Sequence, residues 1–484
     1  MNLDLVGAVR EHLAGDDADA LAFGGRWRSW RWLGDAAASI ERAADGARAI
    51  GLVSRNRPQH VAAFASGIAA RRTTVMIYAA QSPAGIAADI RQLALEAVLA
   101  DSEDWTEEAL EAARETGTAA IVMEDRPDGD IARLLSPGGG GPFRATSADV
   151  AFELLSSGTT GAPKRVPLSW QTLISATTDA RAAYAGTGLT SAPLLMVHPL
   201  GNVAGLGYLT PPLAYGQRIV LLEKFDPLPW AEAVHIYRPV RASLPPAGVR
   251  MVLDAGIAKE DIASLTLIAV GGGKLDPELH ERFEAVYGIP ILTAFGATEF
   301  GGVVANWTLD SYRQWGKAKR GSAGRASFNV ELRVVDTERY EPVAAGQTGL
   351  LEAQVERIGP GWIRTTDLAS IDTDGFLFLH GRTDGAINRG GFKIVPAVVA
   401  AALQMHPAVA DAAVVGIPDA RLGEVPVAAV ELLRGETVAP EQLRDWARER
   451  LIAYQVPVAV KVVAALPRNA SMKISAPDVK ALFE

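Results

Sequence analysis

The sequence has no cysteine among its 484 residues. Disulfide bonds, thiolate metal sites and a cysteine acyl carrier are therefore excluded, and the lack of cysteine fits a reducing cytoplasm, where we expect the protein. Positive charge is also in deficit, since 47 Lys and Arg residues stand against 56 Asp and Glu residues and give a formal net charge of −9. We therefore expect no nucleic-acid partner, because such binding needs basic patches that displace counterions.

The pattern predicts neither a secretory signal nor a membrane span. The N-terminal segment carries charged side chains and lacks an apolar core. One stretch, Leu194 to Gln217, has no formal charge apart from a protonatable His198 and is long enough to cross a bilayer. Pro199, Pro211 and Pro212 would break a spanning helix, so we predict a buried strand, a turn and a core helix there.

Histidine is scarce, with seven residues scattered along the chain. A zinc-binding helix needs two histidines on one face, and the pair His280-Glu281 lacks the second. We expect His198 and His380 to be packed or exposed rather than bound to a metal ion.

The chain is too long for a single hydrophobic core, so its length predicts a large and a small domain. Amphipathic segments mixed with short apolar runs are typical of layered α/β structure. We predict an α/β protein with a large multi-layer N-terminal domain, residues 1–383, and a small α+β C-terminal cap domain, residues 384–484. The supporting segments are amphipathic stretches at 5–13, 36–47 and 58–70, an apolar run at 119–123, a glycine-rich connector at 138–142, helices at 277–287, 396–405 and 440–451, and strands at 289–292, 409–415, 425–432 and 461–463.

The most informative segment runs from Leu154 to Val166 and follows strand-like residues 150–154. Gly158 and Gly161 allow backbone conformations closed to other residues and present N–H groups to an anion. Neighbouring Ser and Thr hydroxyls add donors, and Lys164 adds positive charge. The segment predicts a phosphate-binding loop, with a solvated surface turn as the alternative. It is not the P-loop of kinases and GTPases, which has four residues between its glycine and a Gly-Lys-Ser/Thr.

A second segment, residues 293–302, combines Thr298 and Glu299 with flanking glycines after a predicted helix and strand. A hard cation such as Mg²⁺ prefers oxygen ligands and often shares them with a nucleotide, so these residues suit Mg²⁺ and phosphate. A polar turn after a buried strand explains this segment equally well.

A third segment contains Asp367 and Arg382 on the flanks of a hairpin whose turn we expect at Asp374-Gly375. A carboxylate accepts hydrogen bonds from vicinal hydroxyls and a guanidinium donates to their oxygens, so the pair suits a ribose. A fourth segment, residues 466–474, is a basic loop that includes Lys473.

In this order and spacing, the four segments resemble the adenylate-forming superfamily of acyl- and aryl-CoA synthetases, nonribosomal-peptide adenylation domains and beetle luciferases. Weaker similarities lie at 271–275, 321–325 and 406–419. The resemblance implies that Lys473, Glu299 and Thr298 are catalytic and that Glu299 holds Mg²⁺. It places the nucleotide at Ser157, Gly158, Thr159, Thr160, Gly161, Lys164, Gly272, Gly273, Phe295, Gly296, Ala297, Thr298, Asp367, Phe378 and Arg382. It places the acyl pocket at Asn202, Val203, Gly272, Gly296, Gly301 and Gly302.

The resemblance also implies the reaction. A carboxylic acid and ATP give an acyl adenylate and pyrophosphate, with Lys473 bridging the two anions. A mobile cap then swings about a hinge at Asp384, and Gly390 and Gly391 line a tunnel for the thiol of coenzyme A. The implied partners are ATP, Mg²⁺, coenzyme A and a small carboxylic acid.

Several positions depart from the family pattern. Met472 stands where glycine usually precedes the catalytic lysine, and Asn202 stands where many CoA ligases have a histidine or aromatic gate. Further departures are Gly385, Val398, Ala400 and Ser475. These positions affect acyl selection and transfer, so an acyl carrier protein or an amine is an alternative acceptor. Amino-acid activation is disfavoured because residues 199–206 contain no aspartate to hold an α-ammonium group. A nonenzymatic nucleotide-binding relative is the third interpretation.

Overall fold

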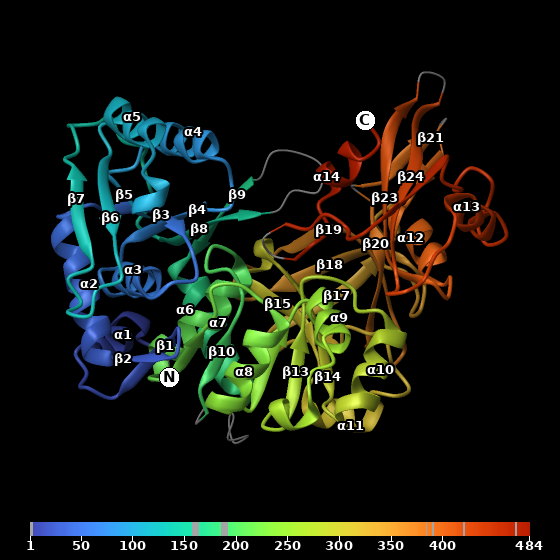
Figure 1. Cartoon of the computed structure of the whole chain (residues 1–484), viewed down its shortest axis with the longest axis horizontal. Coiled ribbons are helices and arrows are strands. Elements are labelled where there is room, and N and C mark those ends of the chain that lie inside the picture. Colours follow the sequence, from blue (N-terminus) through green and yellow to red (C-terminus); the bar gives the residue numbers. More distant parts are fainter. Residues whose placement is uncertain are drawn as a thin grey trace. The chain divides into compact units, whose positions relative to one another are not determined.

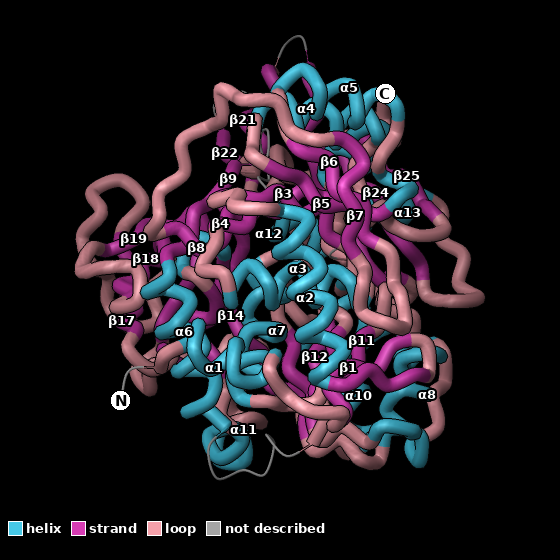
Figure 2. The backbone as a smooth tube through the Cα atoms, turned by 90° about the vertical axis from the view of Figure 1, so that its left-hand side faces the viewer, coloured by secondary structure: helices cyan, strands magenta, loops and turns pink. Residues whose placement is uncertain are grey.

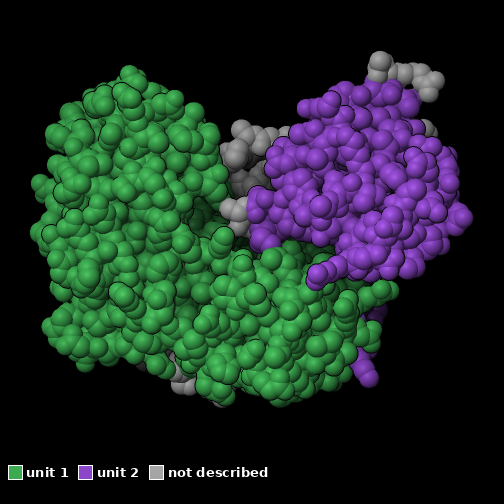
Figure 3. Space-filling view, viewed as in Figure 1, with its two compact units in different colours: residues 1–157, 163–304, 308–314 green, residues 158–162, 305–307, 315–484 purple. Residues whose placement is uncertain are grey.

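The computed structural model describes residues 3–156, 164–184, 192–383, 385–389, 392–419, 422–469 and 472–484. These residues form two compact units, which Figure 3 shows in different colours. Unit 1 holds the described residues up to 304 together with 308–314. Unit 2 holds residues 305–307 and the described residues from 315 onward.

The largest sheet of unit 1 is mostly parallel and carries helices on both faces (Figure 1). Its strands, in spatial order, are β7 (Ala132–Ser136), β6 (Ala119–Met123), β5 (Ala97–Asp101), β3 (Ala49–Ser54), β4 (Thr73–Tyr78), β8 (Val150–Ser156) and β9 (Lys164–Ser169). Side chains alternate between the faces: Ile50 and Leu52 of β3 pack into one core and Ala49 and Val53 into another. The first core includes α1 (Leu5–Leu13), α2 (Trp30–Ala44) and α3 (Pro58–Ala69), and the second includes α4 (Pro83–Leu93) and α5 (Glu107–Thr116).

A second sheet of unit 1 brings together segments far apart in the sequence (Figure 2). Its strands, in spatial order, are β10 (Leu194–Met196), β11 (Ile219–Leu221), β1 (Asp19–Phe23) and β2 (Arg26–Ser29). Helix α7 (Val203–Tyr215) follows β10, so the strand, turn and helix predicted for 194–217 are confirmed. Within the described residues, none of the helices combines the length and the apolar character needed to cross a membrane.

Three parallel strands of unit 1 position the glycine-rich segments. They are β12 (Arg241–Leu244), β13 (Leu267–Val270) and β14 (Ile291–Ala297). The other helices of this unit are α6 (Trp170–Tyr184), α8 (Pro227–Tyr237), α9 (Pro246–Asp254), α10 (Pro277–Tyr287) and α11 (Leu309–Trp315). Strand β15 (Gly302–Asn306) carries the chain from unit 1 into unit 2.

Unit 2 contains two antiparallel sheets in succession. The first is formed by β17 (Val330–Val335), β18 (Gly349–Val355), β19 (Trp362–Ile371) and β20 (Leu377–Arg382), and the short β16 (Arg325–Ala326) pairs with β15. The second is formed by β22 (Phe392–Ile394), β21 (Ile387–Arg389), β24 (Gly423–Leu432) and β23 (Val409–Asp419), with β25 (Ala459–Val463) parallel to β24. Its helices are α12 (Pro396–Gln404), α13 (Pro440–Arg448) and α14 (Ala476–Ala481). The boundary expected at residue 384 lies between these two sheets, and a separate, mobile cap stays a prediction.

Several predicted bounds needed correction. The amphipathic segment at 36–47 belongs to a helix that starts at Trp30, because the hydroxyl of Ser29 accepts a hydrogen bond from the backbone N–H of Trp32 and caps it. Strand β14 extends to Ala297 instead of ending at 292, so the predicted turn begins later. Strand β23 runs on to Asp419 because it pairs with β24 along a long hairpin, and helix α13 ends at Arg448 rather than 451. The helix at 277–287 is confirmed, and the apolar run at 119–123 forms strand β6.

Candidate active site

The glycine loop at 271–273 and the segment at 293–299 lie beside each other in unit 1. They continue from β13 and β14, which are adjacent parallel strands with Val270 opposite Thr293. A Cβ atom on Gly271 would lie 3.8 Å from the backbone oxygen of Ala294. Ligands of open parallel sheets bind at the carboxyl ends of the strands, where these two segments meet. The structure therefore places the start of the predicted glycine loop beside the middle of β14, and a Cβ atom on Gly273 would lie 3.5 Å from Pro246, the first residue of α9.

The turn after β14 explains why glycine is required on both sides of Glu299. A Cβ atom on Gly296 would lie 2.4 Å from the backbone oxygen of Gly302, so a side chain has no room there. Gly302 has φ of 137°, a conformation that favours glycine. Residues Thr298 to Phe300 form a 3₁₀ turn in which Phe300 is buried and Glu299 is exposed. The turn thus presents a carboxylate to solvent on a backbone fixed by Phe300.

The predicted phosphate loop connects two antiparallel strands, β8 and β9. Its residues Ser157, Gly158, Thr159, Thr160 and Gly161 lie outside the described residues, and Lys164 is described only as the first residue of β9. The stem is held by Arg165, whose guanidinium donates to the carboxylate of Asp89 and to the backbone oxygen of Met76, both at 2.9 Å. The side chains of Arg165 and Asp89 are 16% and 15% exposed, so this ion pair is largely shielded from solvent.

Asn202 caps helix α7. Its side-chain oxygen accepts a hydrogen bond from the backbone N–H of Gly205 at 2.7 Å, and Val203 is the first residue of the helix. The sequence pattern gave no sign of the residue that fixes the preceding turn, Asn56. Its amide donates to the backbone oxygen of His198 at 2.9 Å and accepts from the backbone N–H of Leu200 at 3.0 Å. Only tertiary structure brings Asn56 to this turn.

His198 is packed, as expected. Its Nε2 atom is 2.8 Å from the hydroxyl of Ser243, and its ring stacks on Tyr208 with centroids 4.8 Å apart. Burial lowers the pKa of His198 to about 4, so the ring is neutral at pH 7.

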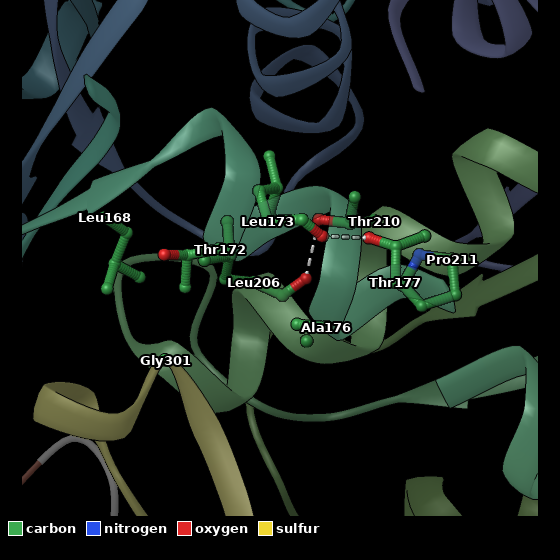
Figure 4. Close-up of a pocket in the computed structure, with 10 residues that line it drawn as sticks. Leu168, Thr172, Leu173, Ala176, Thr177, Leu206, Thr210, Pro211 and Gly301 are labelled. Carbon is green, nitrogen blue, oxygen red and sulfur yellow. Dashed lines mark hydrogen bonds between the residues drawn. The ribbon is translucent and has the colours of Figure 1, made fainter. Parts of the chain in front are cut away.

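A small pocket lies between α6, α7 and Gly301 (Figure 4). Among the described residues that line it, none has an ionisable side chain. Thr177 donates to the backbone oxygen of Leu173 and Thr210 to that of Leu206, and the hydroxyl of Thr172 lies 2.9 Å from that of Ser169. A Cβ atom on Gly207 would meet no atom within 4 Å. The pocket is lined by Leu168, Thr172, Leu173, Ala176, Thr177, Leu206, Gly207, Thr210, Pro211 and Gly301. The predicted acyl-site residue Gly301 therefore lies in the wall of a pocket whose described lining residues carry no charge.

In unit 2, the structure brings Asp367 and Arg382 together. They lie opposite each other on β19 and β20, with Arg382 Nη1 3.9 Å from Asp367 Oδ2. The hairpin predicted at Asp374-Gly375 is confirmed, since Gly375 has φ of 82° between these strands. Phe378 lies on β20 opposite Ser370 and is half-buried. A role of this pair in ribose binding stays a prediction.

Lys473 lies in the loop between β25 and α14 of unit 2. The predicted hinge residue Asp384 and the predicted tunnel residues Gly390 and Gly391 lie outside the described residues.

The segment at 321–325 has a structural role in unit 2. A Cβ atom on Gly324 would lie 2.2 Å from the backbone of Asn306, and φ of Gly324 is 88°. The guanidinium of Arg325 stacks 4.3 Å above the ring of Phe376.

Within the described ranges, one acidic group has metal-like spacing: Asp101, Glu103 and Asp104. Arginines engage all three carboxylates, because Arg55 pairs with Asp104 at 2.6 Å and Arg57 with Asp101 at 2.7 Å and Glu103 at 2.9 Å. We therefore assign this group a structural role.

Comparisons with known proteins bear on the family of this chain. The family model described as AMP-binding enzyme matches residues 12–355, and the model described as AMP-binding enzyme C-terminal domain matches residues 399–473. The 4-coumarate–CoA ligase-like 2 protein of Arabidopsis thaliana is 32% identical over 352 residues, which cover 68% of this chain and 61% of that relative. A 2-succinylbenzoate–CoA ligase of Geobacillus is 31% identical over 354 residues, 69% of each chain. The chain thus spans about three fifths of the length of the first of these relatives.

Solved structures show the same fold. ATP-bound MatB from Rhodopseudomonas palustris has a TM-score of 0.83 at 21% identity, covering 100% of this chain and 99% of that one. An o-succinylbenzoate CoA synthetase from Bacillus subtilis, in complex with its acyl-adenylate intermediate, has a TM-score of 0.78 at 22% identity, covering 98% and 97%. The family model alone accounts for well over half of the chain, and the chain belongs to the AMP-binding enzyme family.

Proposed function

We propose that the protein is an AMP-forming acid–thiol ligase. It activates a carboxylic acid with ATP and Mg²⁺ to an acyl adenylate, releases pyrophosphate and transfers the acyl group to coenzyme A. The observation that carries the proposal is the position of the glycine loop at 271–273: it follows β13 and starts beside Ala294 of the neighbouring strand β14, which leads into Thr298-Glu299. The names of the relatives, which are CoA ligases, support the same activity.

The residues present suit the proposed chemistry. A carboxylate and ATP repel each other, so attack at the α-phosphate needs cations in a screened site. Glu299 is an exposed carboxylate on a fixed turn and would hold Mg²⁺, which neutralises phosphate charge when bound. Asp367 and Arg382 would accept from and donate to the ribose hydroxyls. Lys473 would supply the charge that bridges the acid and the nucleotide.

The lining of the pocket beside Gly301 favours a class of acid. A second carboxylate buried there would have no basic partner among the described residues that line the pocket, and an unpaired buried charge is costly. We therefore propose a monocarboxylic acid whose tail is apolar and uncharged. This distinguishes the chain from relatives named for a dicarboxylic acid, such as the 2-succinylbenzoate–CoA ligase.

A panel of acids tests the proposal. The protein is incubated with ATP, Mg²⁺ and each acid, with and without coenzyme A, and adenylate, thioester and pyrophosphate are measured by mass spectrometry. We expect aliphatic or aryl monocarboxylic acids to give thioester only when coenzyme A is present. A protein that forms no adenylate with any acid, and does not exchange pyrophosphate into ATP, would contradict the proposal.

The alternative acceptor is a carrier-protein pantetheine or an amine, and the departures at Met472 and Ser475 favour testing it. Adenylate that forms readily but is not discharged by free coenzyme A would support that alternative. We also propose a cytoplasmic location, which the absence of cysteine supports. One relative is named as peroxisomal, so fractionation of cells that express the full protein decides between the two compartments.

A further inference from the structure

The loop that carries Lys473 contains a strained residue. Met472 has φ of 61°, in the left-handed region that glycine tolerates and that a side chain with a Cβ disfavours. Met472 directly precedes Lys473, so its backbone conformation affects the direction of the lysine side chain. A residue held in such a conformation persists when its surroundings hold it there.

The surroundings of Met472 supply such a restraint. Arg468 donates from Nη1 to the backbone oxygen of Met472 at 3.3 Å and from Nη2 to Asp411 Oδ2 at 2.5 Å. One guanidinium therefore ties the strained peptide to strand β23. The side chains of Arg468 and Asp411 are 21% and 18% exposed, so the pair is better shielded than an ordinary surface ion pair.

Asp411 is itself fixed. Its Oδ1 atom accepts from the side-chain amide of Gln404 on α12 at 2.8 Å and from the backbone N–H of Ala412 at 2.9 Å. The pairing of β23 with β24 shifts register between Val409 and Asp411, so Asp411 lies directly after an irregularity in the strand. Asp411 thus forms a rigid anchor for Arg468.

The rest of the loop is closed by short-range bonds. The backbone N–H of Asn469 donates to the oxygen of Lys473 at 2.8 Å, and the side-chain oxygen of Asn469 accepts from the N–H of Lys473 at 3.1 Å. Leu466 before the loop is buried, and Ile474 after it packs on the same core. These bonds hold the backbone at Lys473, and the conformation at Met472 sets the direction in which the chain enters it.

We propose that the Asp411–Arg468 pair is a positioning device for Lys473: it holds Met472 in the left-handed conformation, in place of the glycine that would adopt it freely. This inference rests on the proposed function, in which Lys473 serves adenylation. It assigns to Arg468 and Asp411 a role in the first half-reaction that acts through the loop and involves no contact with substrate.

The first test separates the two half-reactions in the full-length protein. Pyrophosphate exchange reports adenylation, and thioester formation from a supplied acyl adenylate reports transfer. We expect Arg468→Ala to lower the rate of exchange about tenfold or more, the loss typical of a charged hydrogen bond, and to leave transfer within about threefold of the wild type. Arg468→Lys, which keeps the charge but loses the two-pronged geometry, should lose exchange activity partially. The matched control is Arg448→Ala, which removes an exposed ion pair with Asp445 on α13.

The second test uses a double-mutant cycle with Met472→Gly. Glycine reaches the left-handed conformation without the strain, so Arg468→Ala should reduce exchange several-fold less in the Met472→Gly background than in the wild type. Equal losses in both backgrounds would overturn the proposal, and so would equal losses in exchange and transfer for Arg468→Lys. Because Arg468→Lys retains the ion pair, it keeps the test decisive if Arg468→Ala does not fold.

A further arm separates this inference from the proposed function. If Lys473→Ala exchanges pyrophosphate at the wild-type rate, the role of Lys473 is wrong and the proposed mechanism fails. If Lys473→Ala is inactive in exchange while both Arg468 variants match the wild type, the positioning role alone is wrong.

Discussion

Replacement of Asp367 by asparagine separates a ligand-binding role from a structural one. The substitution keeps the size of the side chain and removes its charge. In the folded chain the partner charge, Arg382 Nη1, is 3.9 Å away, and the side chain of Arg382 is 46% exposed. The side chain of Asp367 is 15% exposed. An ion pair of this length, with one partner open to solvent, contributes by itself at most about 1 kcal/mol to stability. Loss of this ion pair alone should therefore lower the melting temperature of Asp367→Asn by no more than about 4 °C.

The expected effect on ATP is larger. A hydrogen bond to a charged group contributes about 1.5–3 kcal/mol, which corresponds to about a 10- to 150-fold change in an equilibrium constant. If Asp367 accepts from the ribose hydroxyls, the apparent KM for ATP in Asp367→Asn should rise by at least about tenfold. Pyrophosphate exchange measured across a range of ATP concentrations, alongside a thermal melt, gives both quantities.

Two results would refute this reasoning. An unchanged KM for ATP with an unchanged melting temperature would mean that Asp367 does not contact the nucleotide. A large loss of melting temperature would mean that the carboxylate is mainly structural. The matched control is Asp445→Asn, which removes an exposed carboxylate paired with Arg448 in the same unit and should change neither quantity.

Three further predictions concern unit 1. Glu299→Gln should lower the rate of Mg²⁺-dependent pyrophosphate exchange and raise the Mg²⁺ concentration needed for half-maximal rate, because a neutral amide binds a hard dication less well than a carboxylate. If the variant responds to Mg²⁺ as the wild type does, the metal ion binds elsewhere. Gly207 lines the pocket beside Gly301, and a Cβ atom on it meets no atom within 4 Å, so Gly207→Leu should be tolerated by the fold. The larger side chain should narrow the pocket and lower kcat/KM for long or bulky acids more than for short ones, and an unchanged acid preference would mean that the pocket does not hold the substrate. The control is Gly361→Leu, at an exposed glycine with equally open space. Burial lowers the pKa of His198 to about 4. As the pH falls, the unfolded chain therefore binds a proton at this histidine before the folded chain does. The free energy of unfolding should fall between about pH 6.5 and pH 4, by up to about 3 kcal/mol. His198→Gln should therefore lose less stability than the wild type over that interval in urea unfolding experiments, and an identical pH dependence would contradict the assignment.

Much of the fold could be predicted because its signals are local. The helix at 277–287 has an aspartate at its N-cap, a proline in its first turn and a glycine after its last residue, and the structure gives it those same bounds. The turn at Asp374-Gly375 was predictable for the same reason, since one glycine with positive φ reverses the chain. Strand ends were less predictable, because they depend on the length of the partner strand, as β23 shows beside β24.

In the candidate site too, features set by local sequence could be predicted, and features set by distant contacts could not. The pairing of Asp367 with Arg382 was predictable because a short hairpin places its flanks opposite each other. Asn56 was not predictable, since it reaches a turn 142 residues away in the sequence. The need for glycine at 296 was equally hidden, because it comes from the approach of the Gly302 backbone and leaves no local pattern.

The sequence by itself determined the order of the chemical groups: a phosphate-type loop, a Thr-Glu segment, an Asp and an Arg on a hairpin, and a lysine near the C-terminus. It did so because residue type and spacing are written along one dimension. Only the tertiary structure decided which backbone conformations those groups must adopt. Met472 illustrates the reason. Its place in the sequence indicated a departure from glycine, but its left-handed φ of 61° and its restraint by Arg468 depend on Asp411, which lies on strand β23, 57 residues before Arg468. Charge interactions and packing between residues far apart in the sequence set the free energy of a conformation, and the order of residues along the chain does not show which residues will meet.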